Sequence, residues 1–298
     1  YALEKNKDII GGEIQVSNGF KKLIEKKLVP IGFTWWDTGS LKNYIETNKN
    51  FSGGDKKFDF SKGDEFLYFV NGKVIKYFAN ADIAQKRCYR AENSLKGLTP
   101  DIEGKRNNFY SYKKLDGQTL YSVLNNQLVT DFLQWAKKNL WTKKQLSAEE
   151  QIEFAKACKS FYYDKTIKRI EEMERKRSIT DSDNFINGVS VPKLKELFNK
   201  IDWNHIQNGI PSNFHGDLQF DNILVTRDKI SNLQKFVLLD WRQDFGGLTS
   251  HGDVYYDLAK LYGGMILSYQ LIKEGMFSFD MSGSSIYYNY FIKNDLLE

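Results

Sequence analysis

The sequence predicts an α+β fold with two lobes, a small β-rich lobe over residues 52–117 and a larger, mainly helical lobe over residues 118–298. The β-rich lobe is indicated by the dipeptide Asn71-Gly72 between two apolar runs, because this dipeptide is a strong short-range signal for a β-hairpin. The helical lobe is indicated by apolar residues that recur at helical spacing from residue 118 onward. A chain of 298 residues is also long enough to bury a large core and to divide in two.

The charge and hydropathy of the chain argue against several classes of protein. Charged residues make up 27% of the chain and are spread along it, which is typical of a globular protein. The net charge is +5, and Lys and Arg do not gather with aromatic residues on one long face, so nucleic-acid binding is not indicated. A mild positive charge suits anionic nucleotides. No apolar run approaches the roughly 18 residues that span a bilayer, so we expect no membrane partner.

The cysteines and the N-terminus bear on the compartment. Cys88 and Cys158 lie far apart without a CxxC motif, and there are only three histidines, which argues against a zinc site. We therefore expect a reducing, cytoplasmic environment. The first residues have no apolar signal core and do not begin with Met, so we expect a piece of a longer chain.

Residues 1–51 form a segment of their own in this prediction. The run WWDTGS at residues 35–40 is a turn into a helix, with Ser40 as the cap. It resembles the tail of sugar-nucleotide pyrophosphorylases, where a W-x-D-T/I-G-T segment precedes a helix. Since the Gly-rich start of such an enzyme is absent, we interpret residues 1–51 as the remnant of an upstream nucleotidyltransferase domain, joined to the β-rich lobe by a linker at residues 51–55. The alternative is a helical extension that packs on the next domain.

The predicted hairpin brings one lysine to a buried position. Its strands cover residues 66–70 and 73–78, and on the second strand Val74, Lys76 and Phe78 share a face. A lysine between apolar neighbours is costly unless it has an anionic partner, which makes Lys76 a candidate site residue. Lys73 is the alternative, but it lies beside the turn, where we expect water to solvate it.

Helical spacing predicts most of the remaining elements. We expect helices over residues 80–97, 128–141 and 192–201, and a long helix that begins with the capping box Ser147-Ala-Glu-Glu150. The sequence TIKRIEEMERKRS, which continues that helix, is predicted to be a solvated face because of its many opposite-charge pairs. Residues 109–115 are predicted to be a strand. The aromatic C-terminal part, residues 258–298, is predicted to be helical.

The most informative stretch is residues 213–240, NFHGDLQFDNILVTRDKISNLQKFVLLD. Its polar turn carries Asp217, and Asn222 lies five positions later. Two apolar runs separated by a turn then predict a strand pair that ends in Asp240. Because adjacent strands end at the same edge, the three side chains are expected to converge.

Three such groups have the chemistry of phosphoryl transfer. A carboxylate and an amide suit Mg²⁺, which prefers oxygen ligands and leaves room for phosphate oxygens. A second carboxylate can accept the proton of an attacking hydroxyl. Together with a positive group that binds the nucleotide phosphates, two metal ligands and one base are sufficient for phosphoryl transfer. The alternative is a loop in which Asp and Asn only cap turns.

The motif HGDLQFDN with LLDW downstream of it resembles the aminoglycoside phosphotransferase and choline kinase family, the small-molecule branch of the protein-kinase fold. The resemblance implies a bilobal protein-kinase-like fold in which Asp217 is the catalytic base, Asn222 a metal ligand and Asp240 the main metal ligand. Gly216 stands where protein kinases usually have Arg. Asp240 is followed by Trp-Arg and not by a further carboxylate, and Asp244 is a candidate stand-in for a second metal ligand.

The resemblance also assigns roles outside this stretch. Lys76 would hold the α- and β-phosphates of ATP, and Glu92, on the next helix, would pair with Lys76. His215 would support the catalytic loop from inside, and Asp257 would buttress it, while Asp253 is expected to cap a helix. The adenine-binding hinge would lie near residues 112–115.

These features predict an ATP- and Mg²⁺-dependent kinase of a small hydroxyl compound. The resemblance of residues 1–51 to sugar enzymes favours a sugar acceptor for cell-surface polysaccharide synthesis. A choline-type amino alcohol is the next alternative, and an aminoglycoside comes third. A non-catalytic, kinase-like nucleotide-binding module is the alternative from another class. Protein kinase activity is less favoured because no Ala-Pro-Glu segment comes after Asp240.

Overall fold

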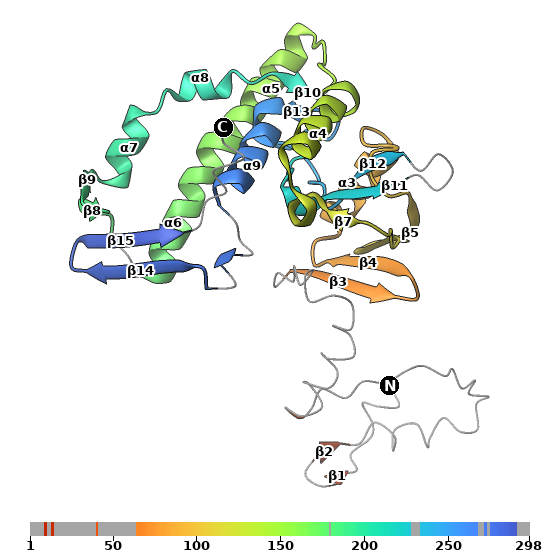
Figure 1. Ribbon diagram of the computed structural model, residues 1–298, viewed down its shortest axis with the longest axis horizontal. Coiled ribbons are helices and arrows are strands. Elements are labelled where there is room, and N and C mark those ends of the chain that lie inside the picture. The colour runs from red at the N-terminus through yellow and green to blue at the C-terminus, as the bar shows by residue number, and fades with distance from the viewer. Residues whose placement is uncertain are drawn as a thin grey trace. The chain divides into compact units, whose positions relative to one another are not determined.

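The turn at Asn71 and Gly72 builds the first sheet of the computed structural model (Figure 1). Both residues have positive φ, 50° and 72°, as a two-residue hairpin turn of this kind requires. β3 (Glu65–Val70) and β4 (Lys73–Phe78) pair antiparallel, with Val70 opposite Lys73, and form the predicted hairpin. β6 (Phe109–Lys113) adds to β4, and β5 (Ile102–Arg106) closes the four-stranded order β3-β4-β6-β5.

The structure describes residues 9–10, 13–14, 40, 64–178, 180–227, 233–267, 271–272 and 275–290. The chain divides into two units, Tyr1–Lys57 and Phe58–Glu298. In the first unit the described residues include the two short antiparallel strands β1 (Ile9–Ile10) and β2 (Glu13–Ile14). The predicted helix that Ser40 would cap and the predicted linker at residues 51–55 lie outside the described residues, so the remnant stays a prediction.

α3 (Ala81–Glu92) comes after the first two strands and contacts β4, β5 and β6. Asn80 caps it by accepting a 3.0 Å hydrogen bond from Asp82 N. Its buried face carries Arg87 and Arg90 among small residues. The helix ends at Glu92, short of the predicted residue 97, because the chain turns after residue 92 and Leu95 N donates to Arg90 O.

A second sheet carries the stretch of greatest interest. β11 (Ile223–Arg227) and β12 (Gln234–Leu238) form the predicted strand pair, and β7 (Gln118–Thr119) extends it in the order β12-β11-β7. The short helix η4 (Phe220–Asn222) leads directly into β11. Leu238 N donates a 2.8 Å hydrogen bond to Leu98 O, which ties this sheet to the turn after α3.

The remainder of the second unit is mainly helical. The capping box at Ser147 and Glu150 is confirmed, since each side chain accepts a hydrogen bond from the other residue's backbone N–H. The elements are η2 (Leu120–Val123), α4 (Asn126–Asn139), α5 (Ala148–Lys159), the π-helical turn η3 (Ser160–Asp164), α6 (Lys165–Arg177), α7 (Leu194–Lys200), α8 (Trp203–Gln207), β10 (Pro211–Ser212), β13 (Gly252–Asp253) and α9 (Val254–Ile266). The predicted α+β class, with a β-sheet N-terminal region and a helical part after it, is confirmed. Among the helices that the structure describes, none combines the length and the apolar character needed to cross a membrane.

Two buried apolar clusters support these elements. The larger one joins the first sheet, α3, α4 and the second sheet, with Phe78, Tyr110, Phe132, Phe220 and Trp241 among its members. The smaller one lies under α5 and η3 and includes Phe154, Phe161, Phe214 and Phe245. Phe214 and Trp241 flank the two ends of the predicted site, so its loops are anchored in the core.

The helical prediction for residues 258–298 is wrong for its second half. β14 (Phe277–Ser282) and β15 (Ser285–Tyr290) form a hairpin, and with β8 (Asn184–Ile186) and β9 (Val189–Val191) they make a sheet of order β14-β15-β8-β9 (Figure 1). The run FSFDMS alternates apolar and polar residues with period two, the signature of a strand, and Gly283 takes the turn with a φ of 58°.

Candidate functional site

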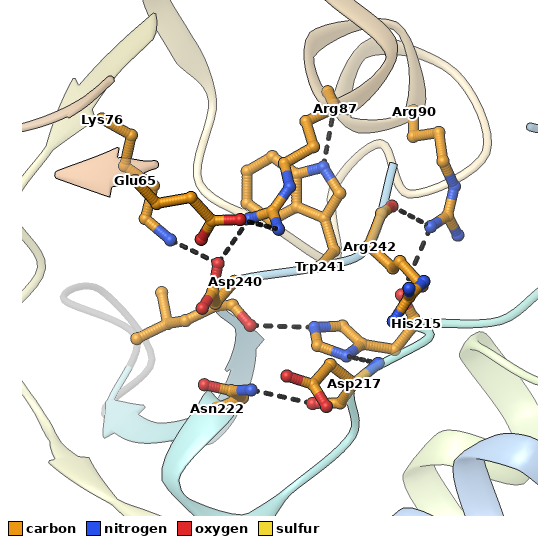
Figure 2. Close-up of polar contacts among 11 residues, drawn as sticks. Glu65, Lys76, Arg87, Arg90, His215, Asp217, Asn222, Asp240, Trp241 and Arg242 are labelled. Carbon is orange, nitrogen blue, oxygen red and sulfur yellow. Dashed lines mark hydrogen bonds and ion pairs between the residues drawn. The ribbon is translucent and has the colours of Figure 1, made fainter. Parts of the chain in front are cut away.

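The loop before β11 and the end of β12 meet, as the sequence predicts (Figure 2). Asn222 Nδ2 donates a 2.8 Å hydrogen bond to the backbone oxygen of Asp217. Leu239 N donates a 2.8 Å bond to Asn222 O, so the residue before Asp240 is fixed to the same turn. Asp217, Asn222 and Asp240 therefore lie on one hydrogen-bonded framework.

His215 locks that framework from inside. Its ring is fully buried, and Nε2 lies 2.9 Å from Leu239 O while Nδ1 accepts from Asp217 N at 3.2 Å. These partners require a neutral ring with its proton on Nε2. The pKa of His215 is lowered to about 4, mainly by burial and also by Arg90, while Asp217 opposes the shift. The expectation that His215 supports the loop is confirmed by these contacts.

Asp257, on α9, holds the backbone of the same loop. Its carboxylate accepts 2.7 Å bonds from His215 N and Gly216 N, and a 3.2 Å bond from Trp141 Nε1. Burial raises the pKa of Asp257 to about 6, and the two backbone N–H donors act in the opposite direction. The predicted buttress is confirmed. Asp253 accepts from Tyr255 N and caps α9, as expected.

Gly216 has a structural reason to be glycine. Its φ is +92°, a conformation that other L-residues rarely adopt. A Cβ there would lie 2.6 Å from Arg242 Cβ and 2.9 Å from the Phe214 ring. The chain after Asp240 thus passes directly over the loop, and Arg242 N donates a 3.0 Å bond to His215 O.

Arg90 is a residue that sequence reasoning missed. It is fully buried on α3, and its guanidinium donates to the backbone oxygens of Phe214, His215 and Arg242. The guanidinium carbon of Arg90 also lies 3.9 Å from the centroid of the Phe214 ring, which adds a cation–π interaction. One helix residue therefore gathers both segments of the site. The only available signal was a second arginine three positions after Arg87.

Lys76 and Arg87 both bind the Asp240 carboxylate (Figure 2). Lys76 Nζ lies 2.6 Å and Arg87 Nη1 2.5 Å from Oδ1 of Asp240. Burial alone would raise the pKa of Asp240, but the two cations outweigh it and hold that pKa well below its usual range. Asp240 is thus ionised. Its backbone has a φ of 54°, which is uncommon for a residue other than glycine.

The burial argument that favoured Lys76 over Lys73 is confirmed. The Lys76 side chain is only 11% exposed, whereas the Lys73 side chain is 52% exposed and pairs with Glu103 at 3.0 Å. Burial lowers the pKa of Lys76, and Asp240 opposes that shift.

The predicted ion pair between Glu92 and Lys76 is wrong. Glu92 binds Lys105 instead, with both carboxylate oxygens at 2.7 and 2.8 Å, and that pair is exposed. Glu92 is the last residue of α3, whereas the buried position that faces Asp240 is Arg87, more than one turn earlier. Besides Asp240, Glu65 on β3 is a second acid near Arg87, at 3.8 Å.

The metal ligands predicted from the sequence retain suitable atoms. Within the described residues, the Asp240 side chain accepts hydrogen bonds through Oδ1, and the Asn222 side chain donates one through Nδ2. Oδ2 of Asp240 and Oδ1 of Asn222 accept no hydrogen bond there. An ionised carboxylate and an amide oxygen are the ligands that Mg²⁺ prefers. Asp244 instead lies 3.6 Å from Lys86 and accepts from Gly247 N. Among the described residues, no three His, Cys, Asp or Glu side chains gather as a metal site on their own.

The carboxylate of Asp217 also has a cationic neighbour. Lys260 Nζ, on α9, lies 2.9 Å from Asp217 Oδ1, and Gln219 Nε2 lies 3.4 Å from the same oxygen. Sequence reasoning missed Lys260, although it lies three positions after Asp257 and so shares a helix face with it.

Comparisons with known proteins give a limited result. No protein-family model matches the chain, and no curated protein matches its sequence. Among solved structures, an ethanolamine kinase from Plasmodium vivax aligns with a TM-score of 0.40 at 16% identity, over 89% of this chain and 76% of that one. The complex of the phosphotransferase APH(2")-IIa with streptomycin and ATP aligns with a TM-score of 0.39 at 18% identity, over 74% of this chain and 75% of that one. At these identities and TM-scores, neither structure assigns a family or an activity to this chain.

Proposed function

We propose that the protein is an ATP-dependent kinase that phosphorylates a hydroxyl group of a small molecule. One observation carries the proposal: Lys76, from the first sheet, contacts Asp240 at 2.6 Å, while Asp240 shares a hydrogen-bonded framework with Asn222 and Asp217. A base, two oxygen ligands and a buried cation are the minimal set for phosphoryl transfer.

In this mechanism each residue has a defined task. Asp217 orients the acceptor hydroxyl and takes its proton as the new oxygen–phosphorus bond forms and the bond to the departing ADP oxygen breaks. Lys76 and Arg87 supply positive charge for the nucleotide phosphates. Asp240 and Asn222 would hold Mg²⁺, which when bound offsets the negative charge of the triphosphate. His215, Asp257 and Arg90 keep the loop in position, so little reorganisation is needed during turnover.

The acceptor is proposed at two levels. At the coarser level it is a small hydroxyl compound. At the finer level it is a sugar used for cell-surface polysaccharide synthesis, which rests on the resemblance of residues 1–51 to sugar nucleotidyltransferases and not on the described structure. The cytoplasm is the proposed compartment, from the unpaired and buried Cys88 and Cys158.

An ADP-release assay with ATP and Mg²⁺, run against sugars, amino alcohols and aminoglycosides, tests the proposal. We expect acceptor-dependent ADP release that is lost by at least about a hundredfold in Asp217→Asn, since that change removes the base but keeps the side-chain shape. ATP binding with no ADP release for any acceptor would favour the non-catalytic nucleotide-binding module instead.

A further inference from the structure

A group of basic side chains lies near Asp217, and one of them contacts it. We define the basic cluster as Lys165, Arg169, Arg242 and Lys260. Lys165 and Arg169 come from the start of α6, Lys260 from α9, and Arg242 from the segment after Asp240. Lys260 contacts Asp217 directly, at 2.9 Å. Segments far apart in the sequence thus bring positive charge to the proposed base.

Two aromatic rings join three of these side chains, Lys165, Arg242 and Lys260. Lys165 Nζ lies 3.8 Å from the centroid of Phe161, and the Arg242 guanidinium carbon lies 5.0 Å from the same centroid. Lys165 Nζ and Lys260 Nζ lie 5.9 and 5.8 Å from the centroid of Tyr256. Cation–π contacts of this kind hold the charged groups against the rings without neutralising their charge.

Two members of the basic cluster, Lys165 and Arg242, have poorly compensated charge, whereas Lys260 pairs with Asp217. Within the described residues, neither Lys165 nor Arg242 has a carboxylate within 4 Å, and the buried Nε of Arg242 has no hydrogen-bond partner. The pKa of Lys165 is lowered to about 7, first by burial and then by Arg242, Arg169 and Lys260, while Asp217 opposes the shift. Neighbouring like charges that are partly buried are costly, and a bound anion would relieve that cost.

The basic cluster is distinct from the cations assigned to the nucleotide. Lys76 and Arg87 come from β4 and α3 and bind Asp240. The basic cluster comes from α6, α9 and the segment after Asp240, and it contacts Asp217 through Lys260. Because the acceptor hydroxyl must approach Asp217, a molecule that donates its proton there also meets the basic cluster.

We infer that the acceptor carries an oxyanion, a carboxylate or a phosphate monoester, that binds Lys165 and Arg242 while its hydroxyl faces Asp217; this rests on the proposed function. The same cluster repels cationic acceptors such as amino alcohols and aminoglycosides. Arg242 can bind such an oxyanion through two parallel hydrogen bonds, and Lys165 adds a point charge. The acceptor class is therefore acidic sugars or sugar phosphates rather than neutral or amino sugars.

Binding calorimetry with four probes that share one ring tests this inference without requiring turnover. Glucose, glucosamine, glucuronate and glucose 6-phosphate are titrated into the full chain with Mg²⁺ and ADP present. We expect glucuronate or glucose 6-phosphate to bind at least tenfold more tightly than glucose and glucosamine, and the better of the two identifies the oxyanion. Lys165→Met should abolish the preference, because methionine keeps the packing on Phe161 but removes the charge. Lys168→Met, at an exposed position on the same helix, is the matched control and should keep it.

Three results would overturn the inference. The first is equal binding, or no binding, of all four probes, and the second is tighter binding of glucosamine than of the anionic probes. The third is a Lys165→Met variant that binds ATP more weakly but binds the anionic probe as before. ADP release measured in the same samples tests the proposed function separately. An anion preference without ADP release from any acceptor retains the anion site and rejects the kinase. ADP release with glucosamine or choline and no anion preference retains the kinase and rejects the anion site.

Discussion

Lys76 and Asp240, 164 positions apart in the chain, meet at 2.6 Å. The contact joins the first sheet to the end of β12, and Arg87 completes it from α3 at 2.5 Å. The two cations share one carboxylate oxygen, and Glu65, 3.8 Å from Arg87, is a second and more distant counter-charge. The two buried cations mark the place where an anionic ligand would be stabilised.

Lys76→Met is expected to raise the KM for ATP or lower kcat by roughly tenfold to a hundredfold, since a charged hydrogen bond is worth about 1.5–3 kcal/mol. Steady-state ADP release at varied ATP measures the change. Lys73→Met, which alters an exposed lysine on the same strand, is the control and should leave both constants within about twofold. Equal effects of the two changes would show that Lys76 has no special role.

Glu92→Gln is expected to leave the KM for ATP unchanged within about twofold, because Glu92 binds the exposed Lys105 and not Lys76. The free energy of unfolding should change little as well, by at most about 0.5 kcal/mol. A tenfold rise in the KM for ATP would mean that Glu92 reaches Lys76 when nucleotide binds, as the sequence had suggested.

Gly216→Ala is expected to unfold more easily and to lose activity, because it combines a φ of +92° with contacts of 2.6 Å to Arg242 Cβ and 2.9 Å to Phe214. Gly247→Ala is the matched control: its φ is +97°, but nothing lies within 4 Å of the added Cβ. Backbone strain costs about 1–3 kcal/mol at either position, so the excess loss at Gly216 measures the clash alone. Equal denaturant midpoints for the two variants would rule out the close passage of Arg242.

His215 should make the free energy of unfolding fall more strongly as the pH decreases. Its native pKa of about 4 lies below the ordinary value of 6.5, so between these values the unfolded chain binds a proton that the native protein does not. The contribution of His215 to stability is therefore complete above pH 6.5 and decreases as the pH falls toward 4, by up to about 3 kcal/mol.

The measurement is the difference in unfolding free energy between the natural chain and His215→Gln at several pH values. Asp257, whose raised pKa of about 6 acts with the opposite sign, is present in both proteins and cancels. The advantage of the natural chain should narrow from pH 7 to pH 4. An advantage that stays constant with pH would contradict a buried, neutral His215.

Local chemistry explains what could be predicted from the sequence. Asn71-Gly72 fixes a hairpin by its backbone preference alone, and the alternation of Val74, Lys76 and Phe78 fixes which lysine is buried. The convergence of Asp217, Asn222 and Asp240 comes from the two strands that hold them.

Helix phase and long-range packing explain what could not. Arg87 and Glu92 both lie on α3, and only the contact of that helix with the sheet decides that the arginine faces Asp240. Lys165 lies directly before the charged segment that was predicted to be a solvated face, and Lys260 lies on α9. That both lysines lie near Asp217 becomes evident only when α6, α9 and η3 pack together.

Magnesium-dependent ATP binding, measured by calorimetry, is the sharpest test of the proposed kinase site. The natural chain should bind ATP more tightly when Mg²⁺ is added. Asp217→Asn should keep that gain, because it removes only the base. Asp240→Asn should lose it, because the proposed main ligand is gone. An undiminished magnesium effect in Asp240→Asn, or no ATP binding by the natural chain, would refute the site.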